Sequence, residues 1–198
     1  MGGHTRAAAA GKVGRELTPV SELRIQTALG TVRIALATEQ APVTTGYFLD
    51  QVRCGRLSGG SIFRVLSSEL SPADTSATID AVQFGTARGL DEERQRIVHE
   101  STAVSGLRHE PWTVSAARFA PGELYASFFV CVQAEPSLDH GGARHPDGEG
   151  FAPFGRVVAG RAVIRRAHEL AEAGGLLKHP VPILDASVID PVAAAKPA

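Results

Sequence analysis

The chain has 198 residues, with 20 lysine and arginine residues against 21 aspartate and glutamate residues and a formal net charge of −1. Basic nucleic-acid-binding proteins and acidic disordered tails both need a strong charge bias, so this balance excludes both classes. With 43% hydrophobic residues, a chain of this length can bury one substantial core, and we expect a single folded domain.

The two ends of the chain differ in pattern from the rest. Residues 1–20 contain four successive alanines and no hydrophobic periodicity, so we expect a flexible arm there and a frayed tail over residues 192–198, with the domain covering residues 21–191. The apolar stretch is too short for a signal-peptide core, and no segment approaches the roughly 20 apolar residues that cross a bilayer. We expect a cytoplasmic protein with no membrane partner; the periplasm is the alternative if a signal peptide has been removed.

The first ordered pattern predicts a hairpin followed by a helix. Over residues 23–36, apolar and polar side chains alternate on both sides of a turn, which is typical of two paired strands. Pro42 then suits the first turn of a helix, and Phe48 and Val52 lie four residues apart on one helical face. This pattern predicts a short helix that ends at Gly55.

Further strand-like segments recur along the chain between loops rich in Gly, Pro, Ser and Asp. They are Ser61–Leu66, Ala81–Gly85, Thr113–Arg118 and residues 128–132. Residues 163–170 then show helical spacing up to Gly174 and Gly175, and a closing strand is expected over residues 181–189. Short strands at such spacing predict a closed β structure, and the polar segment 67–79 predicts a surface loop.

Several short motifs follow one another in a fixed order. In chain order they are Ser61-Ile62-Phe63-Arg64-Val65, Val82-Gln83-Phe84-Gly85, His99-Glu100, Gly106-Leu107-Arg108-His109, Ser115-Ala116-Ala117-Arg118, Phe128-Phe129-Val130-Cys131 and Phe151-Ala152-Pro153-Phe154-Gly155-Arg156-Val157. From residue 23 to residue 190 this order resembles the cyclophilin-type peptidyl-prolyl cis-trans isomerases. Residues 144–148 resemble an Arg-x-Pro-Asp-Gly insertion of a bacterial subgroup.

The resemblance carries expectations about fold and activity. It implies a mainly β protein, a closed eight-stranded antiparallel barrel capped by two α-helices. It also implies an isomerase that catalyses rotation about X-Pro peptide bonds and assists protein folding. The implied partners are proline-containing peptides or unfolded protein segments, with no nucleic acid, and neither a cofactor nor a metal is required.

The same resemblance assigns roles to individual residues. Arg64 matches the catalytic arginine of the family, and Gln83 matches the glutamine that orients the substrate and this arginine. The implied substrate-binding residues are Phe129, Leu138, Phe151, Ala117, Ala81 and Ser127.

Departures from the family pattern qualify the expected activity. Asp80 and Ala81 replace a Phe-Met pair, Ser127 replaces a longer glutamine, and Glu123 and Tyr125 fall in a loop that normally holds small residues. We therefore expect a weak or remodelled isomerase. The alternative is a barrel whose pocket, reshaped by Asp80, Glu123 and Tyr125, binds a peptide or partner without catalysis or acts on a different small-molecule substrate.

One structural observation distinguishes these two hypotheses. An open groove beside Arg64 with an apolar hollow next to it favours the isomerase. A hollow filled by Phe84, Phe119 or Tyr125 favours the remodelled pocket.

Two other groups of polar residues carry less weight. His140, His145, Asp147 and Glu149 crowd one glycine-rich loop, but their spacing fits neither an EF-hand nor a zinc motif, so we expect no metal. Ser115 with His99 or His109 has the residue types of a nucleophilic triad. Because Ser115 lies within a predicted strand and no nucleophile-elbow motif surrounds it, we expect no such activity.

Overall fold

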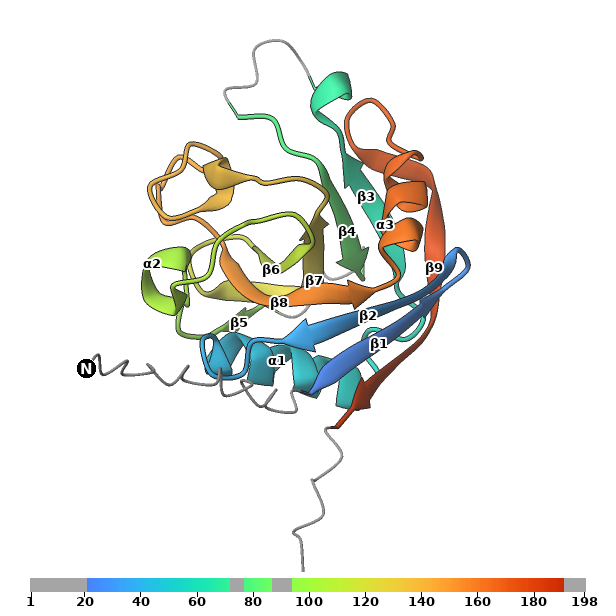
Figure 1. Cartoon of the computed structure of the whole chain (residues 1–198), viewed down its shortest axis with the longest axis horizontal. Helices are drawn as coiled ribbons and strands as arrows, with labels where there is room; N and C mark the ends of the chain where they lie inside the picture. Colours follow the sequence, from blue (N-terminus) through green and yellow to red (C-terminus); the bar gives the residue numbers. More distant parts are fainter. Residues whose placement is uncertain (1–20, 72–76, 87–93, 191–198) are drawn as a thin grey trace, which may run out of the picture.

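A closed antiparallel sheet forms the body of the protein in the computed structural model, which describes residues 21–71, 77–86 and 94–190 (Figure 1). The strands are β1 (Glu22–Thr27), β2 (Gly30–Leu36), β3 (Ser61–Leu66), β4 (Ala81–Gly85), β5 (Gln95–Arg96), β6 (Thr113–Arg118), β7 (Glu123–Cys131), β8 (Ala152–Ala159) and β9 (Leu176–Ile189). Within the described residues, eight of them follow the order β4-β3-β9-β1-β2-β8-β6-β7, and pairing of β7 with β4 closes the ring. The predicted eight-stranded barrel is confirmed, with β5 added beside β7.

Two helices cover the barrel, as predicted. Helix α1 (Pro42–Arg53) lies at its lower end in Figure 1 and contacts β8 and β9, whereas α3 (Arg161–His168) contacts β2, β3 and β4. The apolar face of α1 enters the core, where the rings of Phe48 and Phe154 stack with their centroids 4.2 Å apart. A four-residue helix, α2 (Thr102–Ser105), and short 3-10 turns at Ser68–Leu70 and Pro136–Leu138 were not predicted.

Side-chain alternation across the barrel wall creates two separate apolar clusters. Along β7, Phe128 points into the barrel core, where it stacks on Phe84 of β4 at 5.2 Å, whereas its neighbour Phe129 points outward. Phe129 belongs to a second cluster on the outer surface, together with Ala117 and Leu138. Because adjacent strand residues face opposite sides, the single strand β7 supplies both the core and the outer cluster.

Two strands, β7 and β9, are longer than the sequence pattern predicts. Strand β7 begins at Glu123 rather than at Phe128, so the segment expected to be a loop pairs with β5. Strand β9 is continuous from Leu176, although Pro180 and Pro182 interrupt the pattern on which strand prediction relies. The predicted loop over residues 67–79 contains the Ser68–Leu70 turn, and part of it, like the predicted N-terminal arm and the predicted tail, lies outside the described residues. No helix in the described ranges combines the length and apolar content needed to span a membrane.

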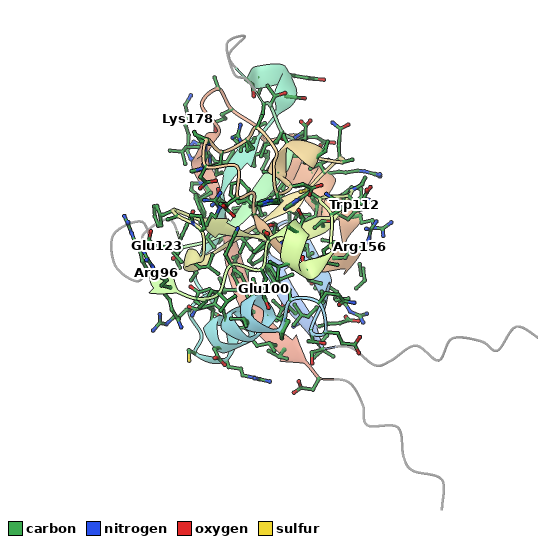
Figure 2. All side chains as sticks on the ribbon, turned by 90° about the vertical axis from the view of Figure 1, so that its left-hand side faces the viewer. Arg96, Glu100, Trp112, Glu123, Arg156 and Lys178 are labelled. Carbon is green, nitrogen blue, oxygen red and sulfur yellow. The ribbon has the colours of Figure 1, made fainter. Side chains whose placement is uncertain are left out.

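A buried carboxylate from a distant loop holds the start of α1. Ala41 at the N-cap offers no side-chain acceptor, but Glu100 accepts hydrogen bonds from the backbone N–H groups of Val43 at 3.1 Å and Thr44 at 2.7 Å. Figure 2 shows Glu100 beside this helix. The negative charge also faces the positive end of the helix dipole.

We predict that Glu100→Ala lowers the free energy of unfolding by about 2 kcal/mol, because two backbone N–H groups at the start of α1, one of them buried, lose a charged acceptor. Chemical denaturation followed by circular dichroism measures this difference. Glu39→Ala is the matched control, since Glu39 is exposed beside the same helix, and it should change the value by less than about 0.5 kcal/mol. Equal unfolding midpoints for the two variants would contradict the capping role.

Candidate functional site

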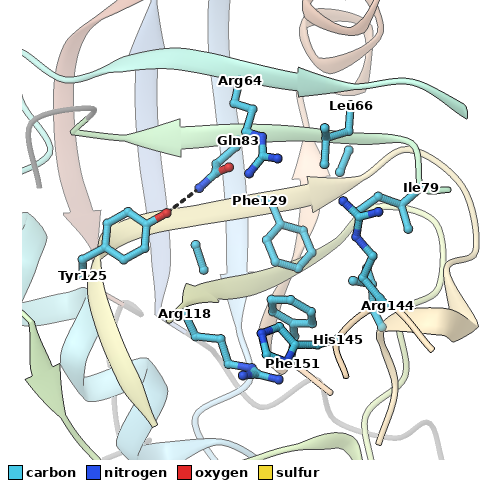
Figure 3. Close-up of a pocket in the computed structure, with 13 residues that line it drawn as sticks. Arg64, Leu66, Ile79, Gln83, Arg118, Tyr125, Phe129, Arg144, His145 and Phe151 are labelled. Atoms are coloured by element: carbon cyan, nitrogen blue, oxygen red, sulfur yellow. Dashed lines mark hydrogen bonds between the residues drawn. The ribbon is translucent and has the colours of Figure 1, made fainter. Parts of the chain in front are cut away.

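A cavity of about 270 Å³ opens over the outer cluster (Figure 3). Of the eight site residues expected from the sequence, seven line it: Arg64, Ala81, Gln83, Ala117, Phe129, Leu138 and Phe151. They come from segments far apart in the chain, and the barrel brings them together because β3, β4, β6 and β7 present their outward side chains on one surface. Leu66, Ile79, Arg118, Arg144 and His145, which also line it, were not expected from the sequence.

Aromatic and aliphatic side chains form the apolar wall of the cavity. Leu138 is fully buried, and Phe129 is 7% exposed. The ring of Phe151 meets that of Phe129 edge to face, with centroids 5.4 Å apart and planes at 86°. Such an arrangement is rigid and favourable for aromatic pairs, so the wall is preformed for a small apolar group.

Arg64 is placed by an irregularity in β3. The register of β3 shifts between Ile62 and Arg64 against both β4 and β9, and a bulge of this kind changes the direction of the side chain. Figure 3 shows the guanidinium reaching down beside Gln83 toward Phe129. The Arg64 Nε atom is buried without a hydrogen-bond partner within the described residues. The terminal nitrogens are thus the part of this cation that faces the cavity.

Gln83 is fixed by two hydroxyl groups. Its Nε2 donates to the Tyr125 hydroxyl at 2.8 Å and to Ser127 Oγ at 3.0 Å, and Ser127 in turn donates to the carbonyl of Phe84 at 2.7 Å. The carbonyl oxygen of the Gln83 amide therefore lies on the side of Arg64 (Figure 3). Ser127 is completely buried and does not line the cavity, so its position differs from the substrate-binding one expected for it. Its contacts are those of a residue that positions Gln83.

Two residues expected to reshape the pocket lie elsewhere. The carboxylate of Asp80 turns away from the cavity, accepts hydrogen bonds from Ser68 and Gln133, and lies 3.2 Å from His168 Nε2. Its neighbour Ile79 faces the cavity instead, so an apolar wall is retained where a charge was expected. Glu123 forms an ion pair with Arg94, with 3.5 Å between Oε1 and Nη1, and does not line the cavity either.

The cavity remains open beside Arg64. Phe84 is enclosed in the barrel core, and Phe119 packs against Tyr125 with ring centroids 5.0 Å apart. Tyr125 lines one side without filling the space. Of the two arrangements considered above, the structure thus has the open groove next to an apolar hollow.

The residues of the imagined nucleophilic triad do meet, but beneath the cavity. His109 connects Asp139 Oδ1 at 2.7 Å with Ser115 Oγ at 3.0 Å, and its ring stacks on that of Phe129 at a centroid distance of 6.3 Å. The side chain of His109 and the whole of Ser115 are fully buried. Because no substrate reaches this serine, the network supports the wall from below.

Arg118 closes one end of the site through an ion pair. Its two terminal nitrogens bind the two carboxylate oxygens of Asp147, each at 2.8 Å, and its Nε donates to the carbonyl of Gly150 at 2.7 Å. The guanidinium also lies 4.8 Å from the centre of the Phe151 ring. The insertion around Asp147, for which a metal role was considered, is thus bound to Arg118.

The sequence of this chain is similar to those of known proteins. Residues 22–188 match the family described as cyclophilin type peptidyl-prolyl cis-trans isomerase/CLD. The peptidyl-prolyl cis-trans isomerase cyp18 of Streptomyces antibioticus is 32% identical over 146 residues, 73% of this chain and 81% of that protein. Peptidyl-prolyl cis-trans isomerase A of Dickeya dadantii is 27% identical over 147 residues, 74% of this chain and 70% of the relative.

Solved structures share the fold at much lower identity. A cyclophilin type peptidyl-prolyl cis-trans isomerase of Cryptosporidium parvum, crystallised in the presence of the dipeptide Ala-Pro, aligns with a TM-score of 0.67 and 16% identity over 85% of this chain and 99% of its own. Together with the family match, these relatives show that the chain belongs to the cyclophilin-type peptidyl-prolyl cis-trans isomerases. This family is one of enzymes.

The Arg118–Asp147 pair makes a testable contribution to stability at low pH. The hydrogen bonds from Arg118 lower the pKa of the Asp147 carboxyl from 3.8 to about 2. Since the folded-state pKa is the lower one, this stabilisation is present above about pH 4 and is lost as the pH falls toward 2. We predict that Asp147→Asn removes this part of the pH dependence.

Urea unfolding midpoints measured between pH 2 and pH 5 give the comparison. Asp50→Asn is the matched control, since Asp50 is exposed on α1, and it should keep the wild-type slope. The ion pair would be shown to contribute nothing if the slopes of wild type and Asp147→Asn coincided.

Proposed function

We propose that this protein catalyses cis-trans isomerisation of X-Pro peptide bonds at the cavity beside Arg64. The barrier to this rotation is about 20 kcal/mol, because amide resonance has to be broken. A guanidinium directed at the prolyl nitrogen stabilises the twisted state, in which the nitrogen lone pair is no longer shared with the carbonyl. The observation that carries the proposal is the guanidinium of Arg64 next to an open apolar hollow.

The size and lining of the cavity fit a proline ring. Pockets for drug-sized ligands have volumes of about 300–1,000 Å³, and this one, at about 270 Å³, is suited to a smaller group. Phe129, Leu138 and Phe151 would contact the ring, with Ala81 and Ala117 at its borders. The proposed substrates are proline-containing peptides or unfolded protein segments, and the relative crystallised with Ala-Pro supports this choice.

Gln83 has the proposed role of a positioning residue. Its amide nitrogen is held by Tyr125 and Ser127, so that its oxygen is available to a substrate N–H or to Arg64. Ser127 by itself engages only one of the two N–H groups of the amide. The Tyr125 hydroxyl engages the other, so the amide cannot rotate freely. The substitutions that predicted a weak enzyme are compensated in part by Ile79 and Tyr125.

The second hypothesis, a barrel that binds without catalysis, makes a different experimental prediction. Such a protein would bind a proline peptide and leave its isomerisation rate unchanged. Exchange spectroscopy by NMR measures both quantities in one sample, because cross-peaks between cis and trans signals report the rate and shifts report binding.

We predict that Arg64→Ala lowers the isomerisation rate of a proline tetrapeptide about a hundredfold, as expected when one preorganised cationic donor is removed. Arg53→Ala is the matched control, because Arg53 lies at the exposed end of α1, and it should retain wild-type activity. A wild-type rate no higher than background, or an Arg64→Ala rate equal to that of wild type, would refute the proposal.

We also predict that Tyr125→Phe lowers the rate about three- to tenfold, with a smaller change in peptide affinity. The hydrogen bond to Gln83 Nε2 is lost, but Ser127 still holds the amide. Tyr47→Phe removes the hydroxyl of a buried tyrosine in α1 and serves as the control, with no expected change in rate. If both variants behaved alike, Gln83 would not depend on Tyr125.

A further inference from the structure

A second, smaller hollow adjoins the cavity. It has a volume of about 170 Å³ and shares three of its lining residues, Arg64, Leu66 and Arg144, with the first. The two spaces therefore lie on either side of the same side chains. Since successive Cα atoms in a chain are 3.8 Å apart, a peptide residue next to a bound proline is close enough to reach this hollow.

Both hollows share two arginines, Arg64 and Arg144. Neither Arg64 nor Arg144 forms an ion pair with any carboxylate in the described ranges, in contrast to Arg118, whose charge is balanced by Asp147. Burial lowers the pKa of Arg144, and the positive charge of Arg64 lowers it further. The negative charge of Glu135 opposes this shift with a smaller effect. Two positive groups thus lie near each other in a partly buried position.

Arg144 is also held in place for binding. One of its terminal nitrogens donates to the carbonyl of Ala77 at 2.7 Å, and its backbone N–H donates to the carbonyl of Ser137 at 3.0 Å. A guanidinium has five N–H donors in a planar fork, and within the described part of the chain Ala77 is the one side-chain hydrogen-bond partner of Arg144, which leaves further donors for a ligand. A carboxylate, which accepts on two oxygens in one plane, matches that geometry.

The carboxylates around the second hollow are already engaged. Glu172 lines it, but its Oε1 accepts from the backbone of Lys178 at 3.0 Å and its Oε2 lies 3.7 Å from the Lys178 ammonium. Glu135 is bound to the backbone N–H of Asp80 at 2.7 Å. Among the residues that the structure describes, no carboxylate at this hollow pairs with Arg64 or Arg144, so both guanidinium groups can attract an acidic group of a ligand.

We propose that Arg144, with the adjacent charge of Arg64, selects substrates in which an acidic side chain lies next to the proline. The carboxylate occupies the hollow behind Leu66 and binds Arg144, while the proline ring lies on Phe129. This inference rests on the proposed function, because it takes a proline peptide as the occupant of the first cavity. Arg144 acts on affinity rather than on the twisted amide, so the acidic side chain lowers KM and leaves kcat unchanged.

The test uses acetylated and amidated proline pentapeptides, in which a Glu or Gln side chain is placed either directly before or directly after the proline. NMR titration gives the dissociation constants, and exchange spectroscopy gives the rates. We expect the Glu peptide of at least one pair to bind about five- to tenfold more tightly than its Gln counterpart. The preference should decrease as salt is added, because added ions screen the guanidinium charges.

Substitutions locate the effect. Arg144→Gln should reduce the preference to less than about twofold, and Arg144→Lys should keep part of it. Arg156→Gln, on the exposed side of β8, is the matched control and should keep the full preference. Glu172→Gln removes a negative charge from the hollow and should strengthen the preference, independently of any effect of Arg144 on folding.

The outcomes separate this inference from the proposed function. Equal affinities within both peptide pairs, or a preference that persists in Arg144→Gln, would overturn the inference even if the protein isomerises its substrates. If the protein bound the Glu peptides preferentially but did not raise their cis-trans exchange rate above that of the free peptides, the result would support the acidic subsite and contradict the isomerase activity. Failure to bind any of the four peptides would refute both.

Discussion

The alternation of side chains across the barrel wall is the constraint on which this structure depends. In β4 and β7, Phe84 and Phe128 enter the core, while Gln83 and Phe129 face outward. A shift of pairing by one residue would exchange these faces and place an amide in the core. The same register that makes the barrel stable therefore builds the cavity, so the site cannot be separated energetically from the fold.

Local patterns were sufficient to predict much of this fold. Alternation and turn residues indicated the hairpin and three strands with their observed ends, and helical spacing indicated α1 and α3. The errors concern features decided by distant partners. Strand β9 contains prolines that disfavour pairing by themselves, and Glu100 caps α1 from a segment 56 residues away.

The candidate site was predicted through its order of motifs rather than through chemistry visible in any one segment. That order located Arg64 and Gln83, which then met in one cavity. It did not reveal that Asp80 turns toward His168 or that Tyr125 binds the Gln83 amide, because both contacts form only after closure of the sheet. Arg144 begins the insertion over residues 144–148, but its position beside Arg64 depends on how that loop folds back onto the barrel.

The fixed orientation of the Gln83 amide also makes the site sensitive to the chain direction of a bound peptide. With Nε2 engaged by two hydroxyls, the amide presents an acceptor and no donor to a bound chain. A peptide is not symmetrical in this respect, since its N–H and C=O groups alternate and proline itself has no N–H. The cavity thus distinguishes a peptide bound in one chain direction from the same peptide bound in the opposite direction. Replacing the contacted amide by an ester would remove the N–H group and with it the hydrogen bond that makes this distinction.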